Sequence, residues 1–161
     1  MSQATITRTT RHAKRRRTLG ADATCDTCGW DGLTALAQTD DGIRCYECAC
    51  SKHGKTAIEA HHHLGRAVDD ATVPIAGNIH RDLSDRQRDW PSTVRTNPQR
   101  DPLLWLAAAV FGLRDHLAWW ADWIERIGTW LVSLATVLTE RDGARWWESM
   151  ELAPVWQAVP A

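Results

Sequence analysis

Four cysteines arranged as two Cys-x-x-Cys pairs constrain this 161-residue chain more than any other feature. Cys25 and Cys28 form the first pair, and Cys45 and Cys48 form the second. The interval between the pairs lies in the range of roughly 15–20 residues that is typical of zinc sites. Four thiolates are the tetrahedral ligand set that zinc prefers in a closed structural site. We therefore predict one structural zinc ion here, with two disulfides, another metal or free thiols as the alternatives.

Residues 21–54 are expected to fold around this ion as a small four-cysteine zinc ribbon. The sequence TDDG at residues 39–42 is a turn signal and predicts a β-hairpin between the two pairs. The fifth cysteine, Cys50, is interpreted as a spare residue or, alternatively, as a ligand that replaces Cys48. The zinc ion would contribute folding free energy rather than chemistry.

Residues 1–20 form a strongly basic segment without a single acidic residue, although the whole chain has a formal charge of -1. Such a segment cannot bury itself, so it is predicted to be a disordered arm. Its function would be phosphate contact with nucleic acid, and a solubilising tail is the alternative. The polar N-terminus has no apolar signal segment, which predicts a reducing, cytoplasmic location. The basic residues of the arm are Arg8, Arg11, Lys14, Arg15, Arg16 and Arg17.

Residues 55–91 carry a cluster of histidines and are predicted to fold as strand, loop, strand and helix. Residues 56–61 alternate in polarity like a strand, and residues 73–75 can form a second extended piece. A helix is expected to open near His80 and to end before Pro91. Adjacent residues on a strand point to opposite sides, so His61 and His62 are expected at a strand end where the chain bends.

This segment resembles the HNH family of metal-dependent nucleases, which have the ββα-metal or His-Me finger fold. The resemblance rests on Glu59-x-His61-His62-x-x-Gly65-Arg66, on Asn78-x-His80, and on the cysteine ribbon just upstream. It covers residues 25–91. The resemblance implies that His62 is the general base that activates water, and that His61 and His80 bind a catalytic Mg, Mn or Zn ion.

One residue of the family pattern has no direct counterpart in the loop between the two histidine motifs. The family usually has an asparagine there to orient the base, and Asp69, Asp70 or Asn78 would take that role here. The resemblance also implies DNA as the partner, with arginines contacting its phosphates. These arginines are Arg66, Arg81, Arg86 and Arg88, together with Arg15, Arg16 and Arg17 of the arm.

Residues 92–101 are interpreted as a linker, and residues 102–161 as a Trp-rich helical region. Asp101 and Pro102 are a helix start. The longest apolar run, residues 103–113, is about half the roughly 20 residues that cross a bilayer, so no transmembrane segment is predicted. Large apolar residues then recur at steps of three and four, as in a coiled coil. They are Leu106, Val110, Leu113, Leu117, Trp120, Ile124, Ile127, Leu131, Leu134 and Leu138.

The apolar face of this region is too broad to remain exposed to water. We expect self-association through residues 102–141 or, in its place, a fold-back near Gly128, and contact with a membrane surface or another protein is the alternative. Gly143 is the expected end of the helix. The predicted fold class is α+β: a zinc ribbon, a ββα-metal-like module and a helical C-terminal region. The function expected is DNA hydrolysis by an HNH-type endonuclease. The alternative is a non-catalytic, zinc-dependent DNA-binding or assembly protein.

Overall fold

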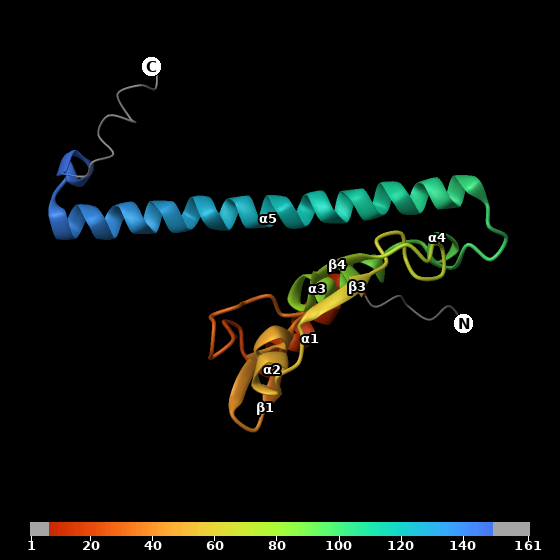
Figure 1. The fold of residues 1–161 in the computed structure, drawn as a ribbon, viewed down its shortest axis with the longest axis horizontal. Coiled ribbons are helices and arrows are strands. Elements are labelled where there is room, and N and C mark those ends of the chain that lie inside the picture. The colour runs from red at the N-terminus through yellow and green to blue at the C-terminus, as the bar shows by residue number, and fades with distance from the viewer. Residues whose placement is uncertain (1–6, 150–161) are drawn as a thin grey trace, which may run out of the picture. The chain divides into compact units, whose positions relative to one another are not determined.

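A computed structural model describes residues 7–149 of the chain, which has an α+β fold (Figure 1). The described part contains helices and two small antiparallel sheets, and a long helix lies toward its C-terminal end. The chain divides into two units, Met1–Leu117 and Ala118–Ala161. All the candidate site residues lie in the first unit, so its architecture determines which of them meet.

The cysteine segment contains the hairpin predicted from its sequence. Strand β1 (Leu36–Thr39) pairs with β2 (Gly42–Cys45), with Leu36 opposite Cys45 and Thr39 opposite Gly42. Thr39 donates its hydroxyl to the Gly42 carbonyl at 2.7 Å, and Gly42 takes a positive φ of 103° that favours glycine. Helix α2 (Tyr46–Lys52) follows β2 directly. The second cysteine pair is therefore held where a strand passes into a helix.

The histidine segment folds as two strands and a helix, in the order expected. Strand β3 (Ile58–His61) pairs antiparallel with β4 (Val73–Ala76), and helix α3 (Gly77–Gln87) follows β4 without a loop. Gly77 is needed at this junction, because a Cβ there would lie 2.4 Å from the ring of Tyr46. This close approach brings α2 of the cysteine segment against α3.

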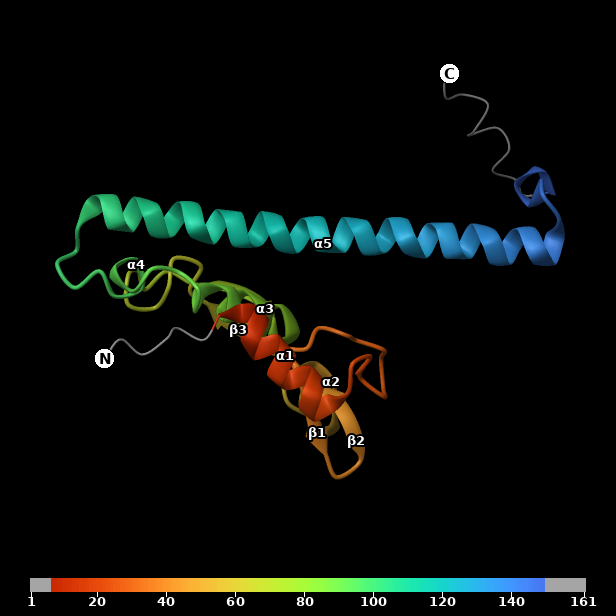
Figure 2. The same cartoon turned by 180° about the vertical axis from the view of Figure 1, so that it is seen from behind.

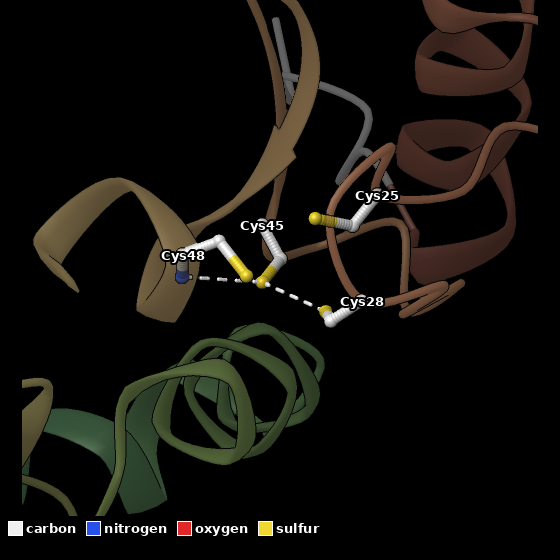
Figure 3. Close-up of side chains that lie close together, drawn as sticks. All are labelled: Cys25, Cys28, Cys45 and Cys48. Carbon is white, nitrogen blue, oxygen red and sulfur yellow. Dashed lines mark hydrogen bonds between the residues drawn. The ribbon is translucent and has the colours of Figure 1, made fainter. Parts of the chain in front are cut away.

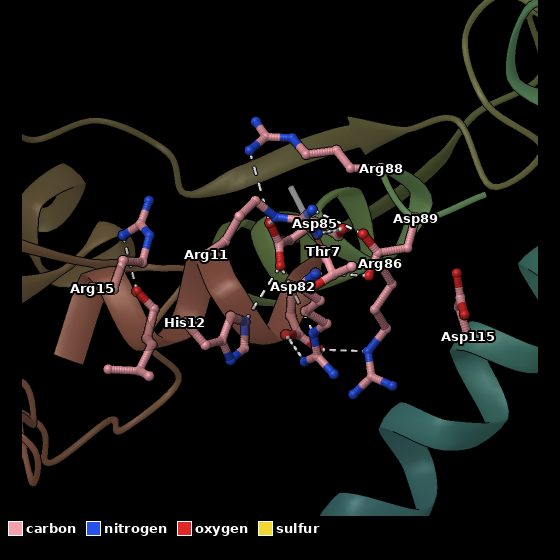
Figure 4. Close-up of polar contacts among 12 residues, drawn as sticks. Thr7, Arg11, His12, Arg15, Asp82, Asp85, Arg86, Arg88, Asp89 and Asp115 are labelled. Atoms are coloured by element: carbon pink, nitrogen blue, oxygen red, sulfur yellow. Dashed lines mark hydrogen bonds and ion pairs between the residues drawn. The ribbon is translucent and has the colours of Figure 1, made fainter. Parts of the chain in front are cut away.

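The N-terminal basic segment differs from its expected disorder, because residues 8–19 form helix α1 (Arg8–Leu19). Thr7 accepts a hydrogen bond from the backbone of Thr10 and caps the helix. Helix α1 lies beside α3 (Figure 2), and carboxylates in and just after α3 hold it (Figure 4). Arg11 donates to Asp85 of α3 at 2.7 Å and to Asp89 at 2.8 Å. These acidic partners are distant in the sequence. Residues 1–20 by themselves therefore give no indication that a helix is stabilised there.

The expected linker also contains a helical turn, α4 (Ser92–Thr96). After it, helix α5 (Pro102–Asp142) begins where the sequence predicted, because the Asp101 carboxylate accepts from the backbone N–H groups of Leu103 and Leu104. Helix α5 ends before Gly143, which has a φ of 91°, as expected. It continues through Gly128, so the alternative of a fold-back there is wrong. A short 3-10 helix, Trp146–Ser149, follows.

The first turns of α5 belong to the first unit and complete a hydrophobic core around Trp90. Leu64, Trp90, Val94 and Ala108 are buried together there. The Trp90 indole donates to the buried carboxylate of Asp115 at 2.8 Å. This core therefore joins the loop after β3, the segment after α3 and the beginning of α5.

In the second unit, α5 carries many exposed apolar side chains. They include Trp120, Trp123, Ile124, Ile127, Trp130, Leu131, Val132, Leu134 and Val137. None of the helices within residues 7–149 combines the length and the apolar character needed to span a membrane.

Candidate functional site

The four predicted zinc ligands lie together in the structure. One possible ligand atom from each of Cys25, Cys28, Cys45 and Cys48 lies within 4.8 Å of all the others. The Sγ atoms of Cys28 and Cys45 are 3.7 Å apart, close to the roughly 3.8 Å separation of two thiolates bound tetrahedrally at about 2.3 Å from zinc. Figure 3 shows the side chains converging from a loop and from the β2–α2 junction. The group can hold a metal ion such as zinc.

Local hydrogen bonds give the first cysteine pair its position. The Gly29 N–H donates to the Cys25 carbonyl at 2.8 Å, and the Cys25 N–H donates to the Trp30 carbonyl at 2.7 Å. Gly29 has a φ of 74°, which lets the backbone curl back toward the thiols. In the second pair, the N–H of Cys48 donates to the Cys45 sulfur at 3.5 Å. Cys50 is buried but lies outside the ligand group.

Electrostatics make this group of thiols favourable for a cation. Burial raises the pKa of Cys25, but hydrogen bonds from backbone N–H groups, first that of Cys45, outweigh it and lower this pKa to about 6. Burial and the neighbouring sulfur atoms of Cys28 and Cys45 raise the pKa of Cys48. Four thiolates cannot share so small a volume without a compensating positive charge. A bound metal ion would supply that charge.

In the histidine segment, His61 and His80 come together from different elements. His61 ends β3 with only 1% of its surface exposed, and His80 lies in the first turn of α3. The centroids of their imidazole rings are 5.1 Å apart. Burial, followed by repulsion from a charge on His80, lowers the pKa of His61 to about 4. His61 is therefore neutral near pH 7 and keeps a lone pair available.

Glu59 orients the His80 ring. Its carboxylate lies 2.5 Å from His80 Nδ1 and 2.6 Å from an Arg81 nitrogen, and it accepts from the Tyr46 hydroxyl at 2.5 Å. Burial raises the pKa of Glu59, but hydrogen bonds from Arg81, Tyr46 and His80 outweigh it and lower this pKa to about 2. With Nδ1 bonded to a carboxylate, Nε2 is the nitrogen of His80 that remains for a metal ion.

His62 lies just beyond β3, at the predicted strand end. Its Nδ1 is 3.2 Å from the backbone carbonyl of Asp69, and its own carbonyl accepts from Gln87 at 2.8 Å. A carbonyl can only accept, so His62 Nδ1 carries the proton and Nε2 has the lone pair. The backbone carbonyl of Asp69 therefore orients the His62 ring, a role that was expected of a side chain.

Asn78 lies in the first turn of α3 and faces α2, away from His62. Its side chain is 1% exposed, and its Oδ1 accepts from the backbone of Glu47 at 3.2 Å. Its own N–H donates to the Glu47 carboxylate at 3.0 Å. These bonds join the cysteine and histidine segments, and none of them involves a histidine.

A third imidazole, which the sequence interpretation did not include, lies beside His61. The ring centroid of His116, on α5, is 5.9 Å from that of His61. The Nδ1 atoms of His61 and His63 are buried without a hydrogen-bond partner. Within residues 7–149, however, the cysteines are the only group of three or more His, Cys, Asp or Glu whose ligand atoms all lie within 4.8 Å.

The predicted phosphate-binding arginines divide into two groups. Some are engaged: Arg81 binds Glu59, Arg86 binds Asp82 at 2.9 Å, and Arg15 donates to the carbonyls of Leu33 and Leu36. The side chain of Arg88 is 66% exposed, with one guanidinium nitrogen 3.8 Å from an Asp85 oxygen. Arg16, Arg17 and Arg66 are also exposed. A cavity of about 400 Å³ lies beside His80. Its lining includes Arg15, Arg81, Arg88, Ser84, Glu59 and Asp85.

No known protein-family model, curated protein or solved structure matches this chain. The site must therefore be interpreted from its own geometry.

Proposed function

We propose that this protein is a metal-dependent endonuclease of HNH type that hydrolyses DNA phosphodiesters. The observation that carries the proposal is the meeting of His61 and His80, 5.1 Å apart, within an arrangement of two strands and a helix. The adjacent His62 supports it, because its Nδ1 is occupied by a backbone carbonyl and its Nε2 is left as a proton acceptor. Together these residues provide ligands for an ion and a base, which hydrolysis of a phosphodiester requires.

His61 and His80 are the residues that would hold the catalytic ion. Zn²⁺, Mn²⁺ and Mg²⁺ are the candidate ions, and imidazole nitrogens suit Zn²⁺ best among these three. When bound, such an ion stabilises negative charge on the phosphate oxygens. His62 Nε2 takes the proton of the attacking water, and the Asp69 carbonyl holds the ring in the tautomer that this step needs.

DNA is the proposed substrate, and the basic groups around His80 support this choice. The cavity beside His80 has Arg15, Arg81 and Arg88 in its lining, together with the carboxylates of Glu59 and Asp85. Guanidinium groups bind phosphate oxygens well. Exposed Arg16, Arg17 and Arg66 would hold the DNA backbone farther out. In the cysteine group, zinc is the proposed ion, with a structural role. Five cysteines without a disulfide fit a reducing cytoplasm.

Cleavage of supercoiled plasmid DNA tests this proposal. Wild type should nick or linearise plasmid with a divalent ion present, and His62→Ala should be slower by about 10²- to 10⁴-fold, the usual contribution of a general base. Exposed His53 provides the matched control, and His53→Ala should cleave like wild type. Plasmid left intact by wild type in Mg²⁺, Mn²⁺, Ni²⁺ and Zn²⁺ would exclude the nuclease.

The second candidate is a zinc-dependent DNA-binding or assembly protein without catalysis. The observation that favours it is that only the cysteines are already gathered to ligand distance. A gel shift with wild-type protein, in the absence of any cleavage, would select this candidate.

We also propose that chains self-associate through residues 102–141. The support is the heptad spacing and the many large apolar side chains that α5 leaves exposed in the second unit. Sedimentation at micromolar concentration should find an oligomer, and Ile124→Lys with Leu131→Lys should shift it toward monomer. Exposed Thr139→Lys, on the same helix, is the matched control. A wild-type monomer would contradict this proposal.

A further inference from the structure

Helix α5 approaches the histidine pair at one residue, His116. This part of the helix belongs to the first unit, where His116 is half-buried and its ring centroid lies 5.9 Å from that of His61. His61, His80 and His116 come from a strand, from one helix and from another helix. Three imidazoles from three elements converge only if the packing between the elements brings them together.

The packing of α5 fixes the position of His116. A Cβ at Gly112 would lie 2.3 Å from the backbone carbonyl of His63, so glycine is required for this close approach. The buried hydrogen bond between Trp90 and Asp115 holds the same stretch of helix. Residues 112 and 116 are one turn apart and lie on the same face of the helix. The close contact at Gly112 therefore directs His116 toward the loop that follows β3.

Hydrogen bonding also selects the nitrogen that His116 presents. Its Nδ1 lies 2.8 Å from the carbonyl of Gly112, so Nδ1 carries the proton and Nε2 keeps its lone pair. His80 has the same arrangement, because its Nδ1 is bonded to Glu59. His61 contributes a buried Nδ1 that has no hydrogen-bond partner. Each ring thus has a nitrogen that a cation can use.

We propose that His61, His80 and His116 bind one divalent transition ion, with α5 supplying the third ligand. The inference rests on the His61–His80 pair of the proposed function. Two imidazoles bound at about 2.0–2.1 Å to one tetrahedral ion have ring centroids roughly 5 Å apart. The His61–His80 distance of 5.1 Å fits this value, and the His61–His116 distance of 5.9 Å is slightly too long.

Binding therefore requires His116 to move closer, since the ligand atoms of the three histidines do not all lie within 4.8 Å in the described residues. His116 is half-buried rather than enclosed in the core, so the movement is assigned to its side chain. Three neutral imidazoles favour Zn²⁺, Co²⁺ or Ni²⁺, whereas Mg²⁺ prefers oxygen ligands. The site is thus assigned to a transition ion and keeps a fourth position for water or a phosphate oxygen.

Cobalt binding to zinc-loaded protein tests the assignment. With one zinc ion in the cysteine group, Co²⁺ titration should reveal a second site whose visible spectrum lacks thiolate-to-cobalt charge transfer. His116→Ala should weaken this site at least about tenfold, the lower end of the loss seen when even an indirect metal partner is removed. Exposed His53→Ala is the control and should bind Co²⁺ like wild type. Mg²⁺ in excess should not displace Co²⁺.

The outcomes separate this inference from the proposed function. If His61→Ala and His80→Ala lose Co²⁺ binding but His116→Ala does not, His116 is not a ligand. The proposed binding of an ion by His61 and His80 would then still stand. If wild-type protein has no second Co²⁺ site, both the three-histidine site and the proposed His61–His80 site are overturned. His116→Gln, which keeps the side-chain length, should show the same loss as His116→Ala. Circular dichroism confirms that each variant is folded, and a folded His116→Gln with wild-type affinity would also overturn the third ligand.

Discussion

The cysteines and the histidines of this chain are gathered in different ways. The four thiols come from one loop and one strand–helix junction within residues 25–48, and their ligand atoms are already within 4.8 Å. The histidines come from β3, α3 and α5, and their rings are neighbours without being gathered to the same degree. Local backbone geometry is sufficient for the first arrangement, whereas the second depends on tertiary packing.

Under the proposed function, the two groups would be two different kinds of metal site. A structural zinc site is closed by four protein ligands, and its ion contributes to folding. A catalytic site keeps a position open and is positioned by hydrogen bonds around its ligands, as Glu59 does for His80. If both proposals hold, removal of one ion unfolds the ribbon, and removal of the other abolishes chemistry without unfolding.

The largest effect is expected at the cysteines. Cys25→Ser should abolish zinc binding and unfold the ribbon, because structural zinc contributes about 10–16 kcal/mol of binding free energy in small zinc domains. Metal analysis and circular dichroism measure this. Cys50→Ser, outside the ligand group, should retain one zinc per chain. If Cys25→Ser stays folded and keeps a full equivalent of zinc, the cysteine group is not the structural zinc site. The contrast between a structural and a catalytic site would then fail.

Stepwise chelation should separate the two ions next. The histidine site has fewer protein ligands, so a mild chelator should abolish DNA cleavage first and leave the circular dichroism spectrum unchanged. A stronger chelator should then remove the cysteine-bound ion and unfold the ribbon. The measurement follows activity, ellipticity and released zinc in the same sample. Simultaneous loss of activity and structure would indicate a single functional ion.

A smaller effect is expected at the contact that docks α5. Asp115→Leu leaves the Trp90 indole N–H buried without its acceptor, which should cost about 1–3 kcal/mol of unfolding free energy. Asp115→Asn keeps an acceptor oxygen and is the matched control. Urea unfolding followed by circular dichroism measures both. Equal stability of Asp115→Leu and wild type would show that this bond does not hold the helix.

The smallest effect is expected at the α1–α3 contact. Arg11→Gln removes ion pairs to Asp85 and Asp89, and should cost about 0.5–1 kcal/mol because such pairs are partly solvated. The loss should shrink as salt screens the wild-type pairs. Lys14→Gln, an exposed change on the same helix, is the control. Urea unfolding at low and high salt provides the comparison, and a loss independent of salt would argue against an electrostatic contact.

The sequence predicted the features that depend on nearby residues. The hairpin at residues 39–42, the cysteine group, and the cap at Asp101 were all confirmed, since each follows from a few neighbouring side chains. The order of strand, strand and helix in the histidine segment was confirmed for the same reason.

The features that the sequence did not predict depend on distant residues. Helix α1 is held by Asp82 and Asp85 of α3 and by Asp89, which follows α3, and none of these residues belongs to the basic segment itself. His116 lies within an apolar helix, and its approach to His61 depends on the tight contact at Gly112. The only sequence signal was the polar interruption of the apolar run at residues 114–116.

The boundary between the two units lies between Leu117 and Ala118, inside a helix rather than in a loop. A shortened protein that ends in the apparent linker at residues 92–101 would lose Ala108 and Asp115, and with them part of the core around Trp90. One that ends after Leu117 keeps every described contact of that core. For this chain, side-chain contacts therefore define the smallest piece suited to crystallisation or spectroscopy. A map of helices and loops would place its end within residues 92–101, well before Leu117.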